Sequence, residues 1–462
     1  MPAFPLVFRG ALLGLALGAG ACGSDPRPDP VLVVGVDGFE WDVALPLLRD
    51  GRMPHLLSLM ESGSFGFLET TQPTFSPIVW TTIATGKRPR EHGIGGFVKP
   101  GPPGEPPRLY DNSDRRTKAV WNIVSERGLR VGVVGWWMTF PAEPISGVMI
   151  AQTNTEDQVD VDGGRNVWKG ALLRDVPGQV YPPEREAEVW RTFDAASARL
   201  PETELAIFGA FEHEHSELAR RLWENCRWAF RADAVYADLA CSLLSEGESD
   251  LVLAYIGGPD VVGHRFWLWR EPQLYRYRPP DGEVADLGGV IDDYYVYVDE
   301  VLGRLLAAAT PATRVLVLAD HGMHPVNQDL LFDPDAPAGD VNSGHHLDAP
   351  PGMIVVAGEG LRRREAPLDL RSLARSDLVR LASVLDVAPT LLALLDVPAG
   401  ADMPGEPAPG LLDDATLARA RPRVPTHDTP AWIEAHAALD AVDPGARERL
   451  EQLRGLGYVG EE

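Results

Sequence analysis

Residue types that hold metal ions gather at four places along this chain. They are Asp37, the pair Asp260 and His264, the adjacent pair Asp320 and His321, and the stretch Ser-Gly-His-His-Leu-Asp at 343–348. Carboxylates and imidazoles together suit zinc, or less specifically manganese or iron. The set is large enough for two ions sharing one site, and two ions about 4 Å apart form a clamp for in-line displacement at phosphorus.

Each of these places also has an ordinary interpretation. An Asp after a strand usually caps the next helix, Asp-His-Gly is commonly a turn, and D-x-x-x-H is commonly an exposed helix pair. Four such places, all at the ends of strands of one sheet, favour the metal interpretation. The segment 72–94 adds hydroxyls, among them Ser76, which precedes Pro77. Ser76 can be an N-cap, a nucleophile, or both, because a helix N-terminus also attracts phosphate.

The elements that must position these residues are apolar strands alternating with helices. Continuous apolar runs of this kind are typical of strands buried on both faces. They stand within 31–42, 131–137, 251–260, 315–322 and 353–360, with helical patterns at 117–127, 218–244, 291–309 and 384–395. The alternation predicts an α/β fold with a doubly wound, largely parallel sheet, in which ligands bind beyond the carboxyl ends of the strands.

The motifs together resemble the alkaline phosphatase superfamily, and within it the type I phosphodiesterase and nucleotide pyrophosphatase branch. The matching pieces are GVDGFEWD, TFSPIVWTTIATGKRPREHGI, YIGGPDVVGHRFW, VLVLADHGM and SGHHLDAPPGM, in order over about 30–360. The resemblance implies an alkaline-phosphatase-like fold and a metal-dependent hydrolase of phosphate esters. It implies two divalent metal ions, most commonly zinc.

The same resemblance assigns roles to residues. In this family the nucleophilic Thr or Ser lies nine residues before a Thr-Gly pair, here Thr85-Gly86. Ser76 stands at that distance and is the expected nucleophile. Thr74, eleven residues before Thr85, is the alternative. One ion is expected on Asp37, Asp320, His321 and the Ser76 oxygen. The second is expected on Asp260, His264 and either His345 or His346, of which His346 is preferred.

Two departures from the family pattern bear on the substrate. The nucleotide pyrophosphatases carry an Asn three residues after the nucleophile, where this chain has Val79. That substitution weakens the case for nucleotide diesters. The sulfatase pattern C/S-x-P-x-R is absent around Ser76, which argues against a sulfatase.

The N-terminus has the pattern of an export signal. Arg9 precedes a short apolar run that ends at Cys22, as in secretory signals. We predict a signal peptide at 1–22 of the lipoprotein type with Cys22 lipidated, the alternative being cleavage after Ala21 and plain secretion. The expected location is exported, periplasmic or cell-surface, and lipid-anchored, with 23–30 as a tether.

Changes in composition along the chain predict its domain, its insertions and its C-terminal tail. We expect one catalytic domain over 31–400, with polar or aromatic insertions at about 155–215 and 265–290 forming a helical or irregular cap, and a tail at 401–462 ending in a helix at 450–460. Little strand pattern is visible in 155–215. The motif FEHEH at 211–215 and the four tryptophans at 136, 137, 267 and 269 are interpreted as a solvated helix start and as core packing.

The net charge of the chain limits the kinds of molecule that it can bind. The chain has 462 residues, with 42 Lys+Arg against 67 Asp+Glu, a difference of −25. That balance argues against a nucleic-acid-binding surface. A small phosphorylated substrate is expected, with a membrane reached only through the lipid anchor. If the helix at 218–244 is continuous, Cys226 and Cys241 are about 22 Å apart and form no disulfide. A break in the helix between them would make a disulfide possible in an exported protein.

These observations favour an exported two-metal phosphoesterase, resembling the phosphodiesterases, that acts through a covalent serine intermediate. A phosphomonoesterase or a phosphoryl or phosphono transferase on the same core is the alternative within enzymes. A non-catalytic, metal-containing surface lipoprotein is the alternative outside them.

Overall fold

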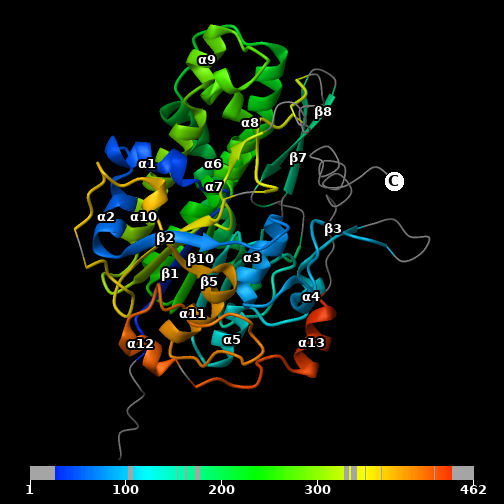
Figure 1. Cartoon of the computed structure of the whole chain (residues 1–462). Helices are drawn as coiled ribbons and strands as arrows, with labels where there is room; N and C mark the ends of the chain where they lie inside the picture. The colour runs from blue at the N-terminus through cyan, green and yellow to red at the C-terminus, as the bar shows by residue number, and fades with distance from the viewer. Residues whose placement is uncertain are drawn as a thin grey trace, which may run out of the picture.

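The computed structural model of the chain describes most of its length (Figure 1). The described residues are 27–101, 108–152, 155–161, 164–170, 172, 177–326, 332–334, 341–348, 350–365, 367–420 and 422–439, without the side chains of 155–161, 164–170 and 225. The predicted signal peptide with Cys22, residues 23–26 of the predicted tether and the predicted helix at 450–460 lie outside these residues.

A nine-stranded sheet forms the centre of the molecule. In spatial order its strands are β15 (Arg380–Ser383), β2 (Ser64–Glu69), β14 (Gly352–Ala357), β11 (Arg314–Leu318), β1 (Val31–Val36), β10 (Leu251–Ile256), β5 (Val131–Val134), β6 (Gly147–Ile150) and β9 (Val180–Tyr181). The five strands from β11 to β6 are parallel. The predicted α/β fold with a largely parallel sheet is confirmed.

Of the strands predicted from apolar runs, the one at 352–357 does not run parallel to the others. β14 runs antiparallel to both β11 and β2, while β9 runs antiparallel at one edge. An apolar run buried on both faces has the same composition in either direction. The composition of the run therefore did not indicate the direction of β14.

Alternate side chains of the strands enter two cores on opposite faces of the sheet. Leu32, Val34 and Val36 of β1 lie in one core, and Val31 and Val33 lie in the other, as the two-residue period of a strand requires.

Helices cover both faces. The first core takes side chains from α1 (Trp41–Arg49), α2 (Pro54–Ser62), α6 (Glu186–Phe208), α7 (Glu217–Glu246), α8 (Gly258–Arg270) and α10 (Val290–Ala308). The second takes them from α3 (Ser76–Thr85), α5 (Val120–Glu126) and α11 (Val387–Leu394). Figure 1 shows the sheet between these two layers. The fold is therefore doubly wound, as predicted.

One of the two predicted insertions differs in part from its expected helical or irregular form. Residues 155–215 contain an antiparallel hairpin of β7 (Thr155–Val161) and β8 (Gly164–Gly170), and then the long helix α6. The expectation of little strand structure there is wrong for the hairpin, because TEDQVDV has too few apolar residues to show a strand period. The second insertion begins inside α8 and continues to α9 (Asp281–Leu287), which stands at the far end of the molecule from α12 (Asp414–Arg419) (Figure 1).

Helix α7 is continuous over 30 residues and contains both Cys226 and Cys241. Both are free thiols, so the prediction that they form no disulfide is confirmed. Among the described residues, none of the helices combines the length and the hydrophobicity that crossing a bilayer requires.

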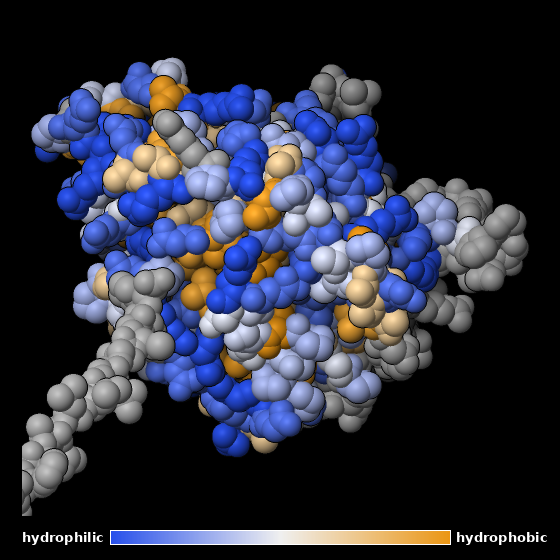
Figure 2. Space-filling model, turned by 90° about the horizontal axis from the view of Figure 1, so that it is seen from below, coloured by the Kyte–Doolittle hydropathy of each residue, from blue (hydrophilic) through white to orange (hydrophobic). Residues whose placement is uncertain are grey.

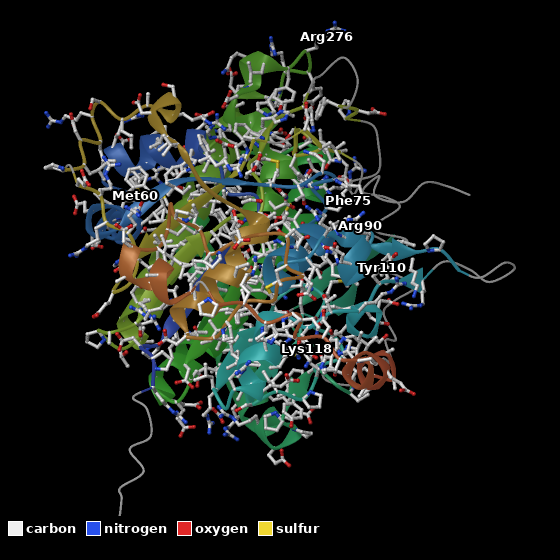
Figure 3. The ribbon with its side chains drawn as sticks, turned by 60° about the horizontal axis from the view of Figure 1, so that its bottom comes forward. Met60, Phe75, Arg90, Tyr110, Lys118 and Arg276 are labelled. Carbon is white, nitrogen blue, oxygen red and sulfur yellow. The ribbon has the colours of Figure 1, made fainter. Side chains whose placement is uncertain are left out.

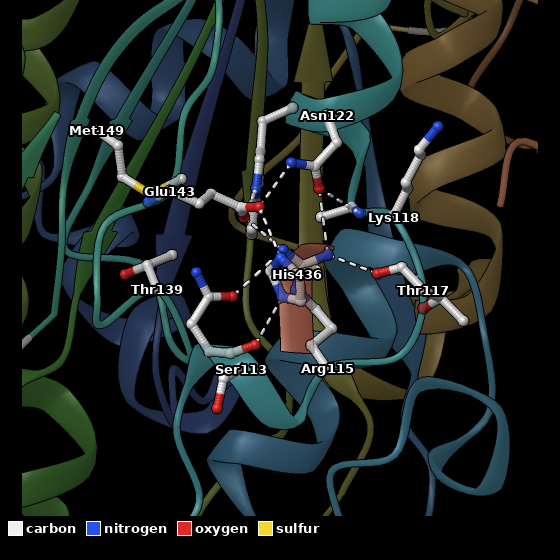
Figure 4. A network of polar contacts seen from close by, with 12 residues as sticks. Ser113, Arg115, Thr117, Lys118, Asn122, Thr139, Glu143, Met149 and His436 are labelled. Carbon is white, nitrogen blue, oxygen red and sulfur yellow. Dashed lines mark hydrogen bonds and ion pairs between the residues drawn. The ribbon is translucent and has the colours of Figure 1, made fainter. Parts of the chain in front are cut away.

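Residues beyond 400 pack against the same body. Met403, Leu411 and Leu412 are buried in the second core. Helix α13 (Pro430–Ala437) inserts His436 into a buried polar network, where its Nδ1 lies 3.2 Å from Glu143 Oε2 (Figure 4). Arg115 pairs with the same carboxylate, and Asn122 Nδ2 donates to it at 2.8 Å.

Further short elements include α4 (Pro89–His92) and the two-residue strand pairs β3 (Val98–Lys99) with β4 (Arg108–Leu109) and β12 (His324–Pro325) with β13 (Gly344–His345). The face seen in Figure 2 is largely hydrophilic, with small hydrophobic patches. Among the described residues, the large exposed hydrophobic side chains are Leu205, Leu274, Leu347, Val379 and Ile433. They are scattered singly along the sequence, which is ordinary for a protein surface.

Candidate active site

Three neighbouring strands bring the predicted metal ligands together. Asp37 follows β1, Asp260 lies in the first turn of α8 after β10, and Asp320 with His321 follows β11. Strands β10, β1 and β11 are adjacent and parallel, so their carboxyl ends meet at one edge of the sheet. This is where open α/β sheets bind ligands.

Asp37, Asp320 and His321 form the first half of the site. His321 Nε2 lies 3.4 Å from Asp37 Oδ1 and 3.3 Å from Asp320 Oδ2. All three side chains are buried. Their oxygen and nitrogen atoms face one shared space.

Asp260, His264 and His346 form the second half. His264 Nε2 lies 3.4 Å from Asp260 Oδ1, because residues four apart share one face of α8. His346 Nε2 approaches the same oxygen at 3.6 Å. Asp260 also offers a ligand atom within 4.8 Å of those of Asp37 and His321, so it joins the two halves.

Of the two histidines that the sequence left open, His346 is the one beside Asp260. His345 Nδ1 lies instead 3.6 Å from Asp348 Oδ1. The preferred residue, His346, is thus placed at the site and His345 is not.

Each imidazole presents Nε2 to the shared space, because Nδ1 is engaged elsewhere. His321 Nδ1 donates to Gly322 O at 3.0 Å, and His264 Nδ1 donates to Gly344 O at 3.0 Å. His346 Nδ1 lies 3.4 Å from Thr74 Oγ1. Hydrogen bonds of this kind select the tautomer whose Nε2 carries a lone pair.

Asp37 is held from outside by two residues that the sequence did not reveal. Tyr255 OH and Trp80 Nε1 both donate to Asp37 Oδ2, at 2.5 Å and 3.0 Å. Trp80 lies one helical turn after Ser76, so the helical period was a signal that could have found it. Tyr255 carried no such signal, since its position in β10 is one of six buried strand residues.

Four buried polar atoms of the site have no hydrogen-bond partner among the described residues. They are Asp37 Oδ1, Asp260 Oδ1, Asp320 Oδ2 and His321 Nε2. A buried acceptor without a partner costs about 1–3 kcal/mol, so four together call for a further group. Cations would satisfy all four, and the donor set of carboxylates and imidazoles fits divalent transition metals.

The pKa shifts of the site residues are also those expected of a metal site. Burial, and then the nearby charge of Asp37, raises the pKa of Asp260 and of Asp320 well above the usual range. Burial lowers the pKa of His264 to about 3 and lowers the pKa of His346 well below its usual range. The carboxylates therefore need compensating positive charge, whereas the imidazoles are neutral and suited to bind it.

Ser76 lies where α3 begins. The helix starts at Ser76 itself and Phe75 is its N-cap, so the N-cap interpretation of Ser76 is displaced by one residue. Ser76 is 5% exposed. The hydrogen bond from Trp80 to Asp37 fixes helix α3, to which Ser76 belongs, against the end of β1. Figure 3 marks Phe75, the residue before it, on the same side of the molecule as Tyr110.

Thr74, the alternative nucleophile, has its hydroxyl engaged. Thr74 Oγ1 donates to His346 O at 2.5 Å, and the residue is fully buried. This hydrogen bond ties the segment before α3 to the loop that carries His346.

The start of α8 is held by a buried carboxylate on α7. Asp233 accepts from Gly257 N at 2.8 Å, Gly258 N at 2.9 Å and Tyr294 OH at 2.8 Å. Burial raises the pKa of Asp233 to about 7. Asp233 thereby orients the turn that carries Asp260, and no motif in the sequence indicated it.

The signals treated as structural lie in structural positions. Trp136, Trp267 and Trp269 are buried, and Trp137 is partly exposed and donates to Tyr255 OH at 2.8 Å. In the FEHEH motif, His213 and His215 bind Asp286 of α9 at 3.0 Å and 2.9 Å. Val79 is fully buried, and its side chain packs among the apolar residues of the second core.

The sheet and its flanking helices define a class, the proteins with an alkaline-phosphatase-like fold. The chain matches the structure of the alkaline phosphatase PafA with a TM-score of 0.51 and 12% identity, covering 84% of this chain and 100% of that chain. More narrowly, the chain belongs to the type I phosphodiesterase/nucleotide pyrophosphatase family, whose model matches residues 31–372. The family resemblance inferred from the sequence is confirmed.

Two further relatives are similar over different lengths. A 2,3-bisphosphoglycerate-independent phosphoglycerate mutase from Rippkaea orientalis is 31% identical over 178 residues, which cover 38% of this chain and 27% of the mutase. The chain thus spans only about a quarter of that relative. Human ectonucleotide pyrophosphatase/phosphodiesterase 5 has a TM-score of 0.43 and 15% identity, covering 80% of this chain and 95% of that chain.

Proposed function

We propose that this phosphoesterase binds two divalent metal ions, most suitably zinc, and cleaves a small phosphodiester through a covalent intermediate on Ser76. The observation that carries the proposal is the set of four buried, unpartnered ligand atoms around Asp260. Asp37, Asp320, His321 and Ser76 would hold one ion, and Asp260, His264 and His346 would hold the other. Bound divalent cations would supply the positive charge that activates a hydroxyl and neutralises charge developing on phosphate.

Ser76 carries the chemistry in this proposal. Its Oγ forms a bond to phosphorus while the ester oxygen on the opposite side leaves as an alcohol, with the serine proton passing to the leaving group or to water. Water then attacks phosphorus, the Ser76–phosphorus bond breaks, the serine oxygen regains a proton, and a phosphate monoester that keeps the second ester group is released. The N-terminal turn of α3 adds a favourable dipole for the phosphate oxygens.

Ser76 is preferred to Thr74 on geometry. The Thr74 hydroxyl is committed to His346 O, whereas Ser76 opens the helix whose Trp80 side chain contacts Asp37. Attack by Thr74 would break a buried hydrogen bond that supports a proposed ligand.

A phosphomonoesterase or a phosphoryl or phosphono transferase is the second candidate. Val79 is buried and supplies no amide to a second ester oxygen, and the curated relative from Rippkaea orientalis is described as a mutase. Both observations favour a substrate with a terminal phosphate.

The first experiment compares a chromogenic phosphate monoester with the matching diester, each with and without a chelator. Faster, chelator-sensitive diester cleavage supports the phosphodiesterase. Faster monoester cleavage supports the second candidate. Absence of turnover on both, with two metal ions bound, would indicate either a narrow natural substrate or a non-catalytic surface lipoprotein.

We also propose export and lipid anchoring through Cys22, on the strength of the N-terminal sequence pattern alone. Metabolic labelling with palmitate should tag the full-length protein but not a Cys22→Ser variant. An exported, processed chain without label would contradict anchoring and leave plain secretion.

A further inference from the structure

A third group of metal-ligand side chains lies next to the candidate active site and shares no residue with it. The group is His324, His345 and Asp348, and the ligand atoms of the three lie within 4.8 Å of one another. The family resemblance left His345 open only as the alternative to His346, which the structure places at Asp260 instead, and the proposed mechanism gives none of the three residues a role.

Two paired strands bring the histidines together. β12 and β13 are antiparallel, and His324 stands opposite His345 in their register. Side chains opposite each other in a strand pair lie on the same face of the ribbon. Their imidazole rings are accordingly 4.2 Å apart between centroids.

Asp348 completes the group from the turn that follows β13. Its Oδ1 accepts from His324 Nε2 at 3.0 Å and lies 3.6 Å from His345 Nδ1. The Asp348 side chain is 78% exposed, so the group is open to solvent on one side. Within the described part of the chain, His345 Nδ1 is buried and makes no hydrogen bond.

Extended backbone separates this group from the active site. His345 and His346 are consecutive and turn to opposite sides, one toward Asp348 and the other toward Asp260. This alternation is what a strand imposes on neighbouring side chains. The third group therefore stands at the rim of the site, one residue away from a proposed ligand.

We propose that His324, His345 and Asp348 bind a further divalent transition-metal ion at this rim. Two imidazoles and one carboxylate form a three-ligand set of the kind that zinc and related ions accept, with water or a substrate anion at the open positions. A simple hydrogen-bonded triad would explain the His324–Asp348 contact, but it leaves His345 Nδ1 buried without a partner. An ion would satisfy all three atoms. The proposal goes beyond the proposed function and does not depend on it.

Metal stoichiometry tests it. The full chain is stripped with a chelator and dialysed to equilibrium against buffered Zn²⁺, and the bound zinc is measured by elemental mass spectrometry. His324→Ala and Asp348→Ala are each expected to hold one ion fewer than the parent protein. The double variant is expected to lose the same single ion.

His213→Ala is the matched control. His213 also pairs with an aspartate, Asp286, at 3.0 Å, but it lies outside the group, so its variant should keep the parent stoichiometry. An unchanged zinc ratio in both test variants would overturn the proposal. Loss of two ions in a variant whose melting temperature is unchanged would also overturn it, because the group would then not be a separate site.

The outcome can be separated from that of the proposed function. Asp348 is exposed, so Asp348→Ala carries the test even if His324→Ala fails to fold. If the parent protein hydrolyses no phosphate ester but still loses one ion in these variants, the function fails and the rim site stands. If the parent protein hydrolyses a phosphate ester but the zinc-to-protein ratio of the variants equals that of the parent, the proposed function stands and the rim site is refuted.

Discussion

The imidazole rings of His321 and His346 stack on each other, with centroids 3.9 Å apart and planes inclined by 18°. His321 belongs with Asp37 and Asp320, whereas His346 belongs with Asp260 and His264. The stack therefore joins the two halves of the candidate site. Burial, together with the charge that His321 and His264 would carry, lowers the pKa of His346, so these rings can lie so close only while neutral, the form that binds metals.

Ser76→Ala is expected to abolish turnover while leaving the metal content unchanged. The reason is that removal of a nucleophile costs about 10³-fold or more in kcat, while the Asp and His ligands remain. Parallel measurement of turnover and bound metal checks both parts. Thr74→Val is the control and should retain measurable turnover. Retained turnover in Ser76→Ala would transfer the role to Thr74.

His264→Ala is expected to remove one bound ion from the active site. His264 Nε2 faces Asp260 Oδ1 at 3.4 Å, and a set of three protein ligands that loses one holds its ion poorly. Zinc titration against a colorimetric chelator measures the loss. His55→Ala, on helix α2 and away from the site, should bind like the parent. An unaltered ratio in His264→Ala would refute the ligand assignment.

Gly258→Ala should disturb the start of α8. A Cβ at this position would lie 1.8 Å from Tyr294 OH, the hydroxyl that donates to Asp233. Overpacking of this kind costs about 1–3 kcal/mol, and it displaces the turn that carries Asp260. We expect a lower free energy of unfolding and weaker zinc binding, measured by urea denaturation and by competition with a chelator.

Tyr294→Phe separates the two effects of that change. It removes the hydrogen bond to Asp233 without adding volume, so a smaller loss of stability is expected. If Gly258→Ala were as stable as the parent protein and bound zinc equally well, the role of the close approach would be refuted.

Glu143→Gln should destabilise the protein in a pH-dependent way. Burial alone would raise the pKa of Glu143, but Arg115 and His436 together lower it from 4.5 to about 2. A carboxyl whose pKa is lower in the folded state stabilises the fold above its unfolded pKa and loses that contribution as the pH falls. The variant leaves Arg115 buried without its charge partner, which costs about 3–5 kcal/mol at neutral pH.

The difference in unfolding free energy between parent and variant should therefore be largest at neutral pH and shrink as the pH falls from about 4.5 toward 2. Urea denaturation over a pH series measures it. Glu126→Gln is the matched control, since Glu126 pairs with Lys118 but is 51% exposed, and it should cost less than about 1 kcal/mol. A difference that does not vary with pH would contradict the assignment.

Much of the fold was predictable because its signals are local. The apolar runs that became β1, β10 and β11 are long enough to be identified without neighbours. The polar hairpin of β7 and β8 was not predictable, because its strands carry little apolar periodicity. The same limit applies to the direction of β14, whose composition suits either orientation.

Part of the candidate site was likewise predictable from the sequence, and part was not. The types and order of its residues, from Asp37 through Asp260 and Asp320 to the paired histidines, are determined by the sequence, as is the burial of the strands that precede them. Convergence follows from topology, since adjacent parallel strands must end at one edge.

Only the tertiary structure decided which of His345 and His346 faces Asp260, and that Tyr255, Trp80 and Asp233 hold the site from outside. The physical reason is range. Strand and helix periods are set by neighbouring residues, whereas the direction of one imidazole depends on the pairing of β12 with β13, and the support of Asp37 depends on strands and helices distant in the chain.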